Sequence, residues 1–364
     1  MMMDRRCWFE IDLNLIAENY RRAQRRVGNK VKIIAVLKAD AYGMGAVKVG
    51  EKLYAEGVRS FAVATAAEAA ELEAALPPDI EVLPLGYCSE AEMRDRVLRG
   101  KPITLYSIRQ AHNLLQIARE CGKKARVHVK IDSGLHRLGF VPETAADEIS
   151  TLLESEAFEL CALFTHLALH NEAMDVRAVE SFLTVRRELE ERGITVPFIH
   201  VLDTLGMVRH PRWYFDGVRL GAWLYGVAPA VEHEPSLMPA RFMSRISQIH
   251  TLAAGEMLGY DDEFHLPRDS RIATVTAGYV DGLPRRAPNW YVAVHGKHAA
   301  VMGIACMDQL LIDVTDIPEA AEGDEVCFIG DGIHIDEYAR MAGLNHNQAW
   351  ACIGKRVERV YIDS

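Results

Sequence analysis

The stretch that decides the fold of this chain is residues 32–45, which read KIIAVLKADAYGMG. Residues 33–37 are apolar or β-branched, as in a buried strand, and the glycines at 43 and 45 end the run. Lys38 follows directly after this strand. A lysine there either extends its ammonium group to water or is desolvated, which lowers its pKa and favours a Schiff base with a carbonyl. Pyridoxal phosphate is usually anchored to proteins through such a Schiff base.

The composition is typical of a globular protein with substantial cores. The 364 residues are 49% hydrophobic and 25% charged, which is enough for two domains and excludes a disordered chain. The formal net charge of -10 argues against a nucleic-acid partner. No apolar window of about 18 residues and no signal-peptide core is present, so we expect a cytosolic (cytoplasmic) protein without a membrane partner.

The seven cysteines are scattered along the chain and odd in number. They form no CxxC pair and no short-spaced cluster with histidine. We therefore expect neither a disulfide framework nor a metal site.

Strand and helix patterns alternate through the first part of the chain. Eight such βα units in about 220 residues favour a (β/α)8 TIM-type barrel, although an open doubly wound sheet has the same periodicity. The helical patterns cover 13–27, 66–75, 89–99, 108–121, 143–153 and 176–192. The strand patterns cover 32–37, 61–64, 82–85, 103–106, 127–131, 160–164, 198–202 and 217–220.

The alternation of strand and helix patterns ends beyond residues 225–229. Residues 231–239 are rich in Pro, Glu and Ser, which is typical of a linker. Short strand patterns then dominate, with one helix pattern near 335–341. We therefore predict a barrel domain over 1–235 and a mainly-β domain over 236–364. The strand patterns of the second domain cover 246–253, 272–276, 291–294, 299–302, 310–314, 326–329 and 359–362.

Polar residues follow several predicted barrel strands where each strand ends. They are Lys38, Asp132 with Arg137, His166, Asp203 with Thr204, and Arg219, near the end of the eighth strand. Each has an ordinary structural explanation, such as a core histidine or a surface ion pair. Because barrel enzymes act at the carboxyl ends of their strands, the convergence of these residues favours an active site at that rim.

The loops after the seventh and eighth strands are the usual phosphate-binding corner of a barrel. Here they contain 204–206, Thr-Leu-Gly, and 220–222, Leu-Gly-Ala, whose backbone N–H groups suit a phosphate. Together with a Schiff-base lysine on the first strand, they imply a phosphorylated aldehyde cofactor across the barrel mouth.

With these motifs, the sequence resembles the alanine racemase family of fold type III pyridoxal-phosphate enzymes. The resemblance runs from Trp8 to Val360. It implies the same barrel and β domain, pyridoxal 5'-phosphate as cofactor, and a head-to-tail homodimer with shared active sites. The motifs that carry it lie at 38–43, 130–140, 215–221, 277–282 and 306–309.

The resemblance also implies two catalytic bases. Lys38 would carry the cofactor and act on one face of the substrate, while Tyr260 from the second subunit would act on the opposite face. A phenol has an ordinary pKa near 10, so Tyr260 needs help to act as a base. In the family pattern His166 orients this tyrosine. Arg137 holds the substrate carboxylate and the phenolic oxygen.

Further roles follow from the resemblance for cofactor and substrate contacts. Arg219 matches the position that hydrogen-bonds the pyridine nitrogen, and Met307 the one whose backbone N–H meets the substrate carboxylate. Lys130 matches a lysine that some members carry as a carbamate, where it neutralises the arginine equivalent to Arg137. The phosphate-contacting positions are Tyr42, Thr204, Gly221 and Ala222.

The chain departs from the family pattern around the expected pocket. The family usually has asparagine at the positions of Asp40 and Asp203. It usually has histidine at the position of Met44 and arginine at that of Ile304. Lys355 replaces a tyrosine that contacts the phosphate and lines the substrate pocket. A carboxylate beside a phosphate costs electrostatic energy. We hypothesise that Asp203 and Lys355 compensate for each other; the alternative is that Lys355 points to solvent.

These observations predict a pyridoxal-phosphate-dependent isomerase that interconverts L- and D-alanine. Serine or another small amino acid is the rival substrate. Alternatives of another class are a decarboxylase of the same fold and a non-catalytic cofactor-binding protein. A decarboxylase does not account for the resemblance at Tyr260 and 307–309. A single-domain cofactor carrier would not need the β domain that supplies Tyr260. D-alanine biosynthesis for the cell wall is the pathway that this activity suggests.

Overall fold

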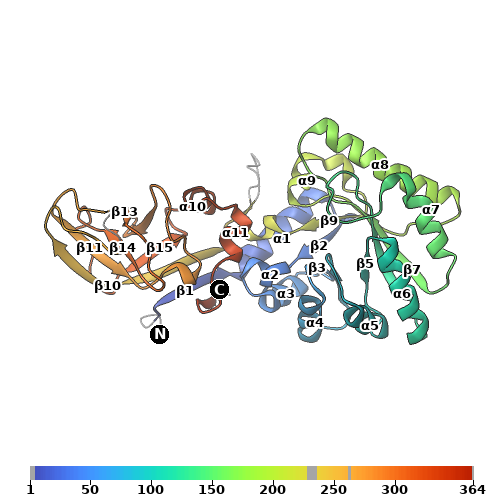
Figure 1. The fold of residues 1–364 in the computed structure, drawn as a ribbon, viewed down its shortest axis with the longest axis horizontal. Helices are drawn as coiled ribbons and strands as arrows, with labels where there is room; N and C mark the ends of the chain where they lie inside the picture. Colours follow the sequence, from blue (N-terminus) through green and yellow to red (C-terminus); the bar gives the residue numbers. More distant parts are fainter. Residues whose placement is uncertain (1–4, 228–235, 261–263, 363–364) are drawn as a thin grey trace.

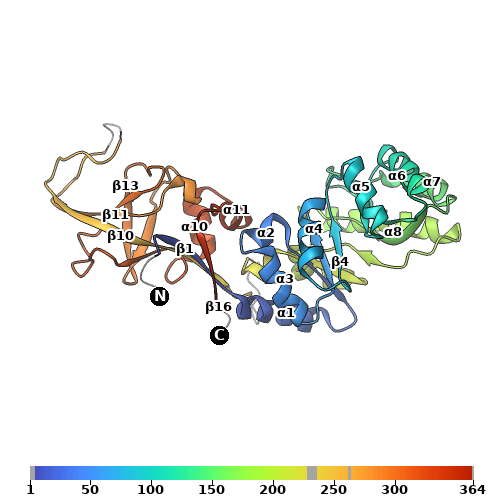
Figure 2. The same cartoon turned by 90° about the horizontal axis from the view of Figure 1, so that it is seen from below.

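The computed structural model describes residues 5–227, 236–260 and 264–362. These residues form two bodies that lie end to end along the longest axis in two perpendicular views (Figures 1 and 2). One body is a barrel of parallel strands surrounded by helices, and the other is a mainly-β domain. The predicted fold class is therefore confirmed, and the open doubly wound sheet is excluded.

All eight barrel strands that the sequence predicts are present. Their spatial order is β4-β3-β2-β9-β8-β7-β6-β5. Side chains join the two ends of this order: Thr104 Oγ1 donates to Pro84 O at 2.7 Å, and Arg96 donates to Val82 O and Pro102 O at 2.6 and 2.8 Å. The strands are β2 (Lys32–Val36), β3 (Ser60–Val63), β4 (Glu81–Pro84), β5 (Ile103–Leu105), β6 (Ala125–Lys130), β7 (Phe158–Phe164), β8 (Ile199–His200) and β9 (Gly217–Leu220).

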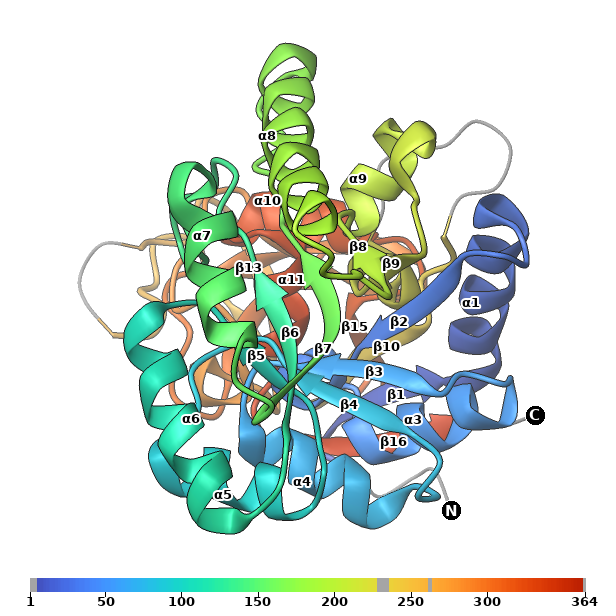
Figure 3. The ribbon, with the colours of Figure 1, turned by 90° about the vertical axis from the view of Figure 1, so that its right-hand side faces the viewer.

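Helices surround the barrel strands, as the view of this end of the molecule shows (Figure 3). Thr65 and Ser89 begin two of them with capping boxes, in which the glutamate three residues later returns a bond to the cap. The last long helix begins earlier than predicted because Asn171 accepts a hydrogen bond from Met174 N at 3.0 Å. The helices are α1 (Leu13–Val27), α3 (Ala46–Ala55), α4 (Ala66–Ala75), α5 (Glu90–Leu98), α6 (Ile108–Cys121), α7 (Pro142–Leu153), α8 (Glu172–Glu191) and α9 (Thr204–Arg209).

The β domain is built on one sheet of order β11-β14-β13-β12-β15-β10-β1-β16. Its strand β1 precedes the barrel in the sequence, yet pairs antiparallel with β10 and parallel with β16. The boundary that we predict near residue 235 stays a prediction, and residues 231–235 of the predicted linker lie outside the described residues. The elements are β1 (Cys7–Asp12), β10 (Ala240–Leu252), β11 (Ser270–Val275), β12 (Tyr291–Val294), β13 (Lys297–Met302), β14 (Leu310–Asp313), β15 (Glu325–Ile329), β16 (Glu358–Ile362), α10 (Ile335–Ala342) and α11 (His346–Ala351).

The β domain contacts the barrel beside the turn that follows β2. A Cβ atom on Gly43 would lie 2.8 Å from Trp350 O, so only glycine allows this approach of α11. Arg359 Nε donates to Gly43 O at 3.1 Å, and Trp350 Nε1 donates to Tyr225 O at 3.2 Å. The contacts at Gly43 join the second domain to the end of the turn that contains Lys38.

Three further observations concern chemistry outside the barrel. All seven cysteines are free. Among residues 5–227, 236–260 and 264–362, no group of three or more His, Cys, Asp or Glu side chains is arranged to hold a metal ion. Within the same residues, every helix is too short or too polar to cross a membrane.

Candidate active site

A cavity of about 240 Å³ opens where the barrel strands end. Of the barrel residues predicted to converge here, Lys38, Arg137, His166, Asp203, Thr204 and Arg219 lie on its wall, whereas Asp132 does not. The structure therefore brings together side chains that are far apart in the chain, from Lys38 to Ala222 within the barrel. The lining residues are Val36, Lys38, Tyr42, Leu85, Lys130, Arg137, Phe164, His166, Asp203, Thr204, Arg219, Gly221, Ala222 and Asn347.

A left-handed turn, α2 (Lys38–Tyr42), follows β2 directly. The φ angles of its last four residues run from 52° to 56°. This conformation costs a non-glycine residue roughly 1–2 kcal/mol, so other contacts must hold it. Ala39 N donates to Glu68 Oε1 at 2.7 Å, and Ala46 N donates to Asp40 Oδ1 at 2.6 Å. Asp40 thus caps the start of the following helix and fixes the backbone beside the lysine.

Lys38 extends from this turn into the mouth of the cavity. Its Nζ lies 5.9 Å from the centre of the Tyr42 ring. Burial by the cavity walls lowers the pKa of Lys38, and the charge of Arg137 lowers it further. A lowered pKa makes the neutral amine more available, and the neutral amine is the form that attacks a carbonyl.

Small and hydroxylic residues form one corner of the cavity. A Cβ atom on Gly221 would lie 2.5 Å from the Tyr42 hydroxyl, so the two residues share a space that only glycine leaves open. Thr204 Oγ1 accepts a hydrogen bond from Trp223 N at 3.2 Å, which orients the hydroxyl. The short helix η2 (Ala222–Tyr225) begins at this corner. The corner therefore has the space and the donors to hold a phosphate group.

Arg219 is held by five contacts at the floor of the cavity and is 4% exposed. Its guanidinium donates to Thr165 O, His200 O and Val201 O, each at 2.8 Å. It also lies 2.8 Å from His200 Nδ1 and 3.2 Å from His166 Nδ1. Burial lowers the pKa of Arg219 to about 10, so the group stays protonated at neutral pH.

His166 stands among cations. Burial lowers its pKa to about 2, and the charges of Arg219, Arg137 and Lys130 add to the shift. The imidazole is therefore neutral at physiological pH. Because Nδ1 accepts from Arg219, the proton is on Nε2, which lies 3.8 Å from Asp203 Oδ2. His166 can donate a hydrogen bond but cannot act as an acid near neutral pH.

Lys130, the last residue of β6, is buried, with 4% of its surface exposed. In the described part of the chain its Nζ has no hydrogen-bond partner and lies 5.8 Å from the Phe164 ring. Burial lowers its pKa to about 8, although Asp132 opposes the shift. The Asp132 carboxylate accepts from His136 N and Arg137 N at 2.9 and 2.8 Å. The aspartate thereby fixes the loop that presents Arg137.

Asp203 has partners other than the predicted lysine. Its Oδ1 accepts a hydrogen bond from Gly206 N at 2.9 Å and caps α9. Lys355 is exposed and does not line the cavity. In the part of the chain that the structure describes, it forms no ion pair with Asp203. A cofactor contact of Lys355 stays a prediction.

Tyr260 and Met307 lie in the β domain and do not line the barrel cavity. Tyr260 is 66% exposed and lines a different cavity of about 470 Å³, together with Phe264 and Ile304. Met307 is 53% exposed. A single chain therefore does not assemble all of the predicted site residues.

A buried aspartate holds the loop that contains Met307. Val280 N donates to Met307 O at 3.2 Å, which packs the 277–282 motif against it. The next residue, Asp281, is fully buried and accepts hydrogen bonds from Arg6 and Arg356. The motif is recognisable in the sequence, but its pairing with these two arginines is not, because they lie far from it in the chain.

Two residues of the site region are absent from the sequence analysis. His200 contacts Arg219, and Asn347 of α11 lines the cavity. His200 could have been found, because it shares the alternation of its strand with Phe198. Asn347 carries no such signal, since its place depends on how the β domain packs against the barrel.

Together these features define a class of protein: a barrel enzyme with a desolvated amine at the end of one strand and, at the end of the neighbouring strand β9, a corner suited to a phosphate. Comparison with protein-family models agrees. Residues 11–229 match the N-terminal domain of alanine racemase, and residues 240–361 match its C-terminal domain. The chain belongs to the alanine racemase family.

Individual relatives extend over nearly the whole chain. An alanine racemase from Methanococcus maripaludis is 32% identical over 99% of this chain and all of its own length. The structure of an alanine racemase from Clostridium difficile is 31% identical and superposes with a TM-score of 0.94, covering 99% of this chain and 96% of its own. That from Bartonella henselae, with covalently bound pyridoxal phosphate, is 28% identical with a TM-score of 0.90, covering 98% and 99%.

Proposed function

We propose that this protein is an alanine racemase that uses pyridoxal phosphate to interconvert L- and D-alanine. The observation that carries the proposal is the convergence of Lys38, Arg219 and the phosphate-sized corner in one cavity. Membership of the alanine racemase family supports the same reaction. The isomerase activity needs a cofactor that acidifies the substrate and two groups that exchange its proton.

The residues present fit the cofactor. Lys38, with its lowered pKa, suits a covalent bond to the aldehyde carbon. Tyr42, Thr204 and Gly221, with Ala222 beside them, suit the phosphate, and Arg219 would donate to the ring nitrogen. When bound, pyridoxal phosphate withdraws electrons from the Cα–H bond of the substrate and makes its proton removable.

Two bases on opposite sides of the substrate would exchange the Cα proton. Lys38 would hold the proton on one face, and Tyr260 of a second copy of the chain would hold it on the other. A neutral His166, which donates through Nε2, would accept no proton itself and would orient the tyrosine oxygen. Arg137 and the backbone N–H of Met307 would hold the substrate carboxylate.

A homodimer with shared sites would bring Tyr260 to the barrel mouth. Within one chain Tyr260 and Lys38 line separate cavities. Several large apolar side chains of the β domain are also exposed, and exposed apolar surface is typical of interfaces. These side chains are Met257, Tyr260, Tyr279, Val280 and Met307.

Lys130 is suited to carbamylation. Its buried amine has no partner among the described residues, and its pKa of about 8 leaves part of it neutral and able to react with carbon dioxide. The resulting negative charge would face Arg137 in a cationic cavity. ¹³C NMR of enzyme equilibrated with labelled bicarbonate should give a carbamate signal that Lys130→Ala removes; a signal retained in that variant would refute the assignment.

The reaction itself is tested by Cα hydrogen exchange in deuterated buffer. We expect the enzyme with pyridoxal phosphate to exchange and invert alanine faster than serine or any other amino acid of a panel, measured by proton NMR and chiral chromatography. Lys38→Ala should lose at least about 10³-fold in rate, because both the cofactor bond and one base are removed. Release of carbon dioxide without inversion would instead indicate a decarboxylase.

The shared site is tested by mixing two inactive variants. Lys38→Ala chains and Tyr260→Phe chains, each inactive alone, should recover activity when they are co-expressed and isolated as a hybrid. In a head-to-tail dimer, one of the hybrid's two sites combines an intact Lys38 with an intact Tyr260. A hybrid as inactive as its parents would refute the shared site but leave the racemase assignment standing.

A further inference from the structure

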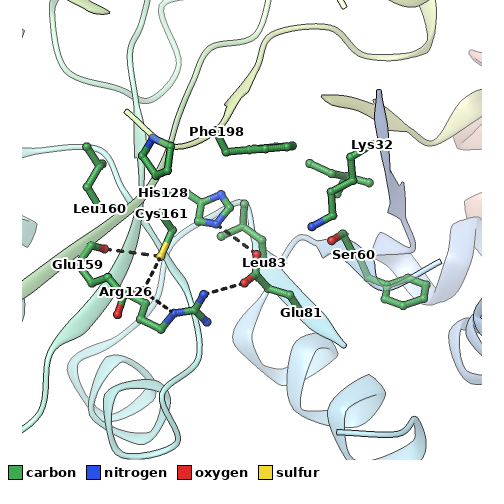
Figure 4. Close-up of a pocket in the computed structure, with 13 residues that line it drawn as sticks. Lys32, Ser60, Glu81, Leu83, Arg126, His128, Glu159, Leu160, Cys161 and Phe198 are labelled. Carbon is green, nitrogen blue, oxygen red and sulfur yellow. Dashed lines mark hydrogen bonds and ion pairs between the residues drawn. The ribbon is translucent and has the colours of Figure 1, made fainter. Parts of the chain in front are cut away.

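A second barrel cavity, of about 420 Å³, lies at the opposite mouth of the barrel, where the strands begin (Figure 4). Lys32, Ser60 and Glu81 are the first residues of β2, β3 and β4, and all three line it. The proposed racemase chemistry takes place at the other mouth and uses none of these residues. The cavity therefore needs an explanation of its own.

One side of this cavity is already neutralised. Arg126 contacts Glu81 at 3.0 Å and Glu159 at 3.3 Å, and Glu81 Oε1 lies 3.4 Å from His128 Nε2. The contact with His128, and after it that with Arg126, lowers the pKa of Glu81 to about 2, while burial raises that of the Cys161 thiol to about 11. Glu81 therefore stays ionised and Cys161 stays a thiol at neutral pH, so neither side chain is poised to exchange a proton or attack a carbon there.

Two hydrogen-bond donors on the other side, the exposed Lys32 ammonium and the buried Ser60 hydroxyl, have no complementary charge or acceptor among the described residues. Ser60 is 4% exposed, and its Oγ has no hydrogen-bond partner among the described residues. Lys32 Nζ lies 5.6 Å from the centre of the Phe198 ring, and within the described ranges no carboxylate reaches it. Figure 4 shows both side chains across the cavity from Arg126 and Glu159. A buried hydroxyl without a partner is unfavourable unless a ligand supplies one.

We propose that this cavity binds a small monocarboxylate with an apolar carbon body. The ammonium of Lys32 and the hydroxyl of Ser60 would donate to the carboxylate, and the carbon body would lie against Phe198, Leu83 and Ile34. The single uncompensated cation matches a single negative charge. A dianion such as phosphate would leave one charge unpaired beside an apolar wall.

The binding is tested directly with 4-fluorobenzoate, a monocarboxylate whose ring suits the apolar wall. We expect the holoenzyme to bind it at concentrations up to roughly 10 mM, followed by ¹⁹F NMR line broadening. Lys32→Met and Ser60→Ala should each weaken binding by about tenfold, since each removes a donor to the carboxylate. Lys30→Met is the matched control, because Lys30 precedes the same strand but does not line the cavity.

The Ser60→Ala variant separates a binding role from a structural one. Because the hydroxyl has no partner, its removal should leave the melting temperature at or above that of the parent while the probe affinity falls. Absence of binding, affinity that neither variant changes, or equal loss in Lys30→Met would overturn the proposal. Displacement of the probe by saturating alanine would also overturn it, because the probe would then occupy the active-site cavity.

Discussion

The two mouths of the same barrel differ in how their charges are compensated. Four cationic side chains, Lys38, Lys130, Arg137 and Arg219, line the carboxyl mouth, and Asp203 is the one carboxylate among its lining residues. At the amino mouth, Lys32, Arg126 and His128 line the cavity together with the carboxylates of Glu81 and Glu159. An excess of buried cations is costly unless a ligand brings negative charge. The carboxyl mouth is therefore built for an anionic cofactor and substrate. At the amino mouth both carboxylates have Arg126 or His128 as partners, and among the described residues Lys32 has no carboxylate partner.

A series of side chains in contact with one another runs through the barrel and connects these two mouths. Arg219 donates to His200 Nδ1 at 2.8 Å, and His200 Nε2 lies 3.4 Å from His128 Nδ1. His128 Nε2 in turn lies 3.4 Å from Glu81 Oε1. Because His200 accepts from Arg219 at Nδ1 and burial lowers its pKa, its proton is on Nε2 and points toward His128. The polar groups inside the barrel thus form one network with a cation at one end and a carboxylate at the other.

The largest contrast should appear when the arginine of each mouth is replaced. Arg219→Met should lower the free energy of unfolding by about 3–5 kcal/mol, because three carbonyl oxygens lose their buried donor. Arg126→Met should cost about 1 kcal/mol, since its ion pairs are partly exposed. Urea denaturation of both variants checks this contrast. Equal losses in the free energy of unfolding would show that the two arginines contribute equally to stability.

Lys130 at the carboxyl mouth should make the protein more stable as the pH rises above neutral. The pKa of Lys130 is about 8 in the folded chain against an ordinary value of 10.5, so the unfolded state holds more protons between these values. Stability should rise with pH across this window by at most about 3 kcal/mol. The measurement is the pH profile of unfolding for the parent minus that for Lys130→Met, in buffer depleted of carbon dioxide. A difference between parent and variant that does not change with pH would contradict a lowered pKa for the buried amine of Lys130.

The amino mouth should respond at the opposite end of the pH scale. The pKa of Glu81 is about 2 against an ordinary 4.5, so its stabilisation is complete above pH 4.5 and is lost as pH falls toward 2. We expect about 1–2 kcal/mol, because the side chain is 30% exposed and solvent screens its contacts. The Glu81→Gln variant should not lose this stability when unfolding is followed as a function of acid pH. If parent and variant lose stability in parallel as pH falls, the contacts of Glu81 do not contribute to stability.

The smallest contrast concerns one hydroxyl at each mouth. Thr204→Val should destabilise the protein by about 1 kcal/mol, because Trp223 N loses its acceptor in a buried corner. Ser60→Ala should change stability by less than about 0.5 kcal/mol, since no bond is lost. Thermal denaturation of the two variants measures the difference. A larger loss in Ser60→Ala would mean that this hydroxyl has a partner in solution.

Much of the fold was predictable because its signals are local. The apolar run of 33–36 and the seven strand patterns after it depend on neighbouring residues, and each became a barrel strand. The helix α9 was missed because six residues are too few for a helical period, and α3 because it begins directly after the glycines that end the first strand. The motif order around Lys38 was likewise enough to indicate the family.

The sequence by itself determined the eight-strand alternation, the lysine after the first strand and the family, since periodicity and motifs are properties of neighbouring residues. Only the tertiary structure decided that β1 joins the second sheet, that Asp203 caps a helix, and that Tyr260 lies in a cavity apart from Lys38. The physical reason is that partners such as Arg219 and Thr165 are 54 residues apart, and packing alone chooses among the contacts open to each. Pairing at that separation leaves no periodic trace in the chain.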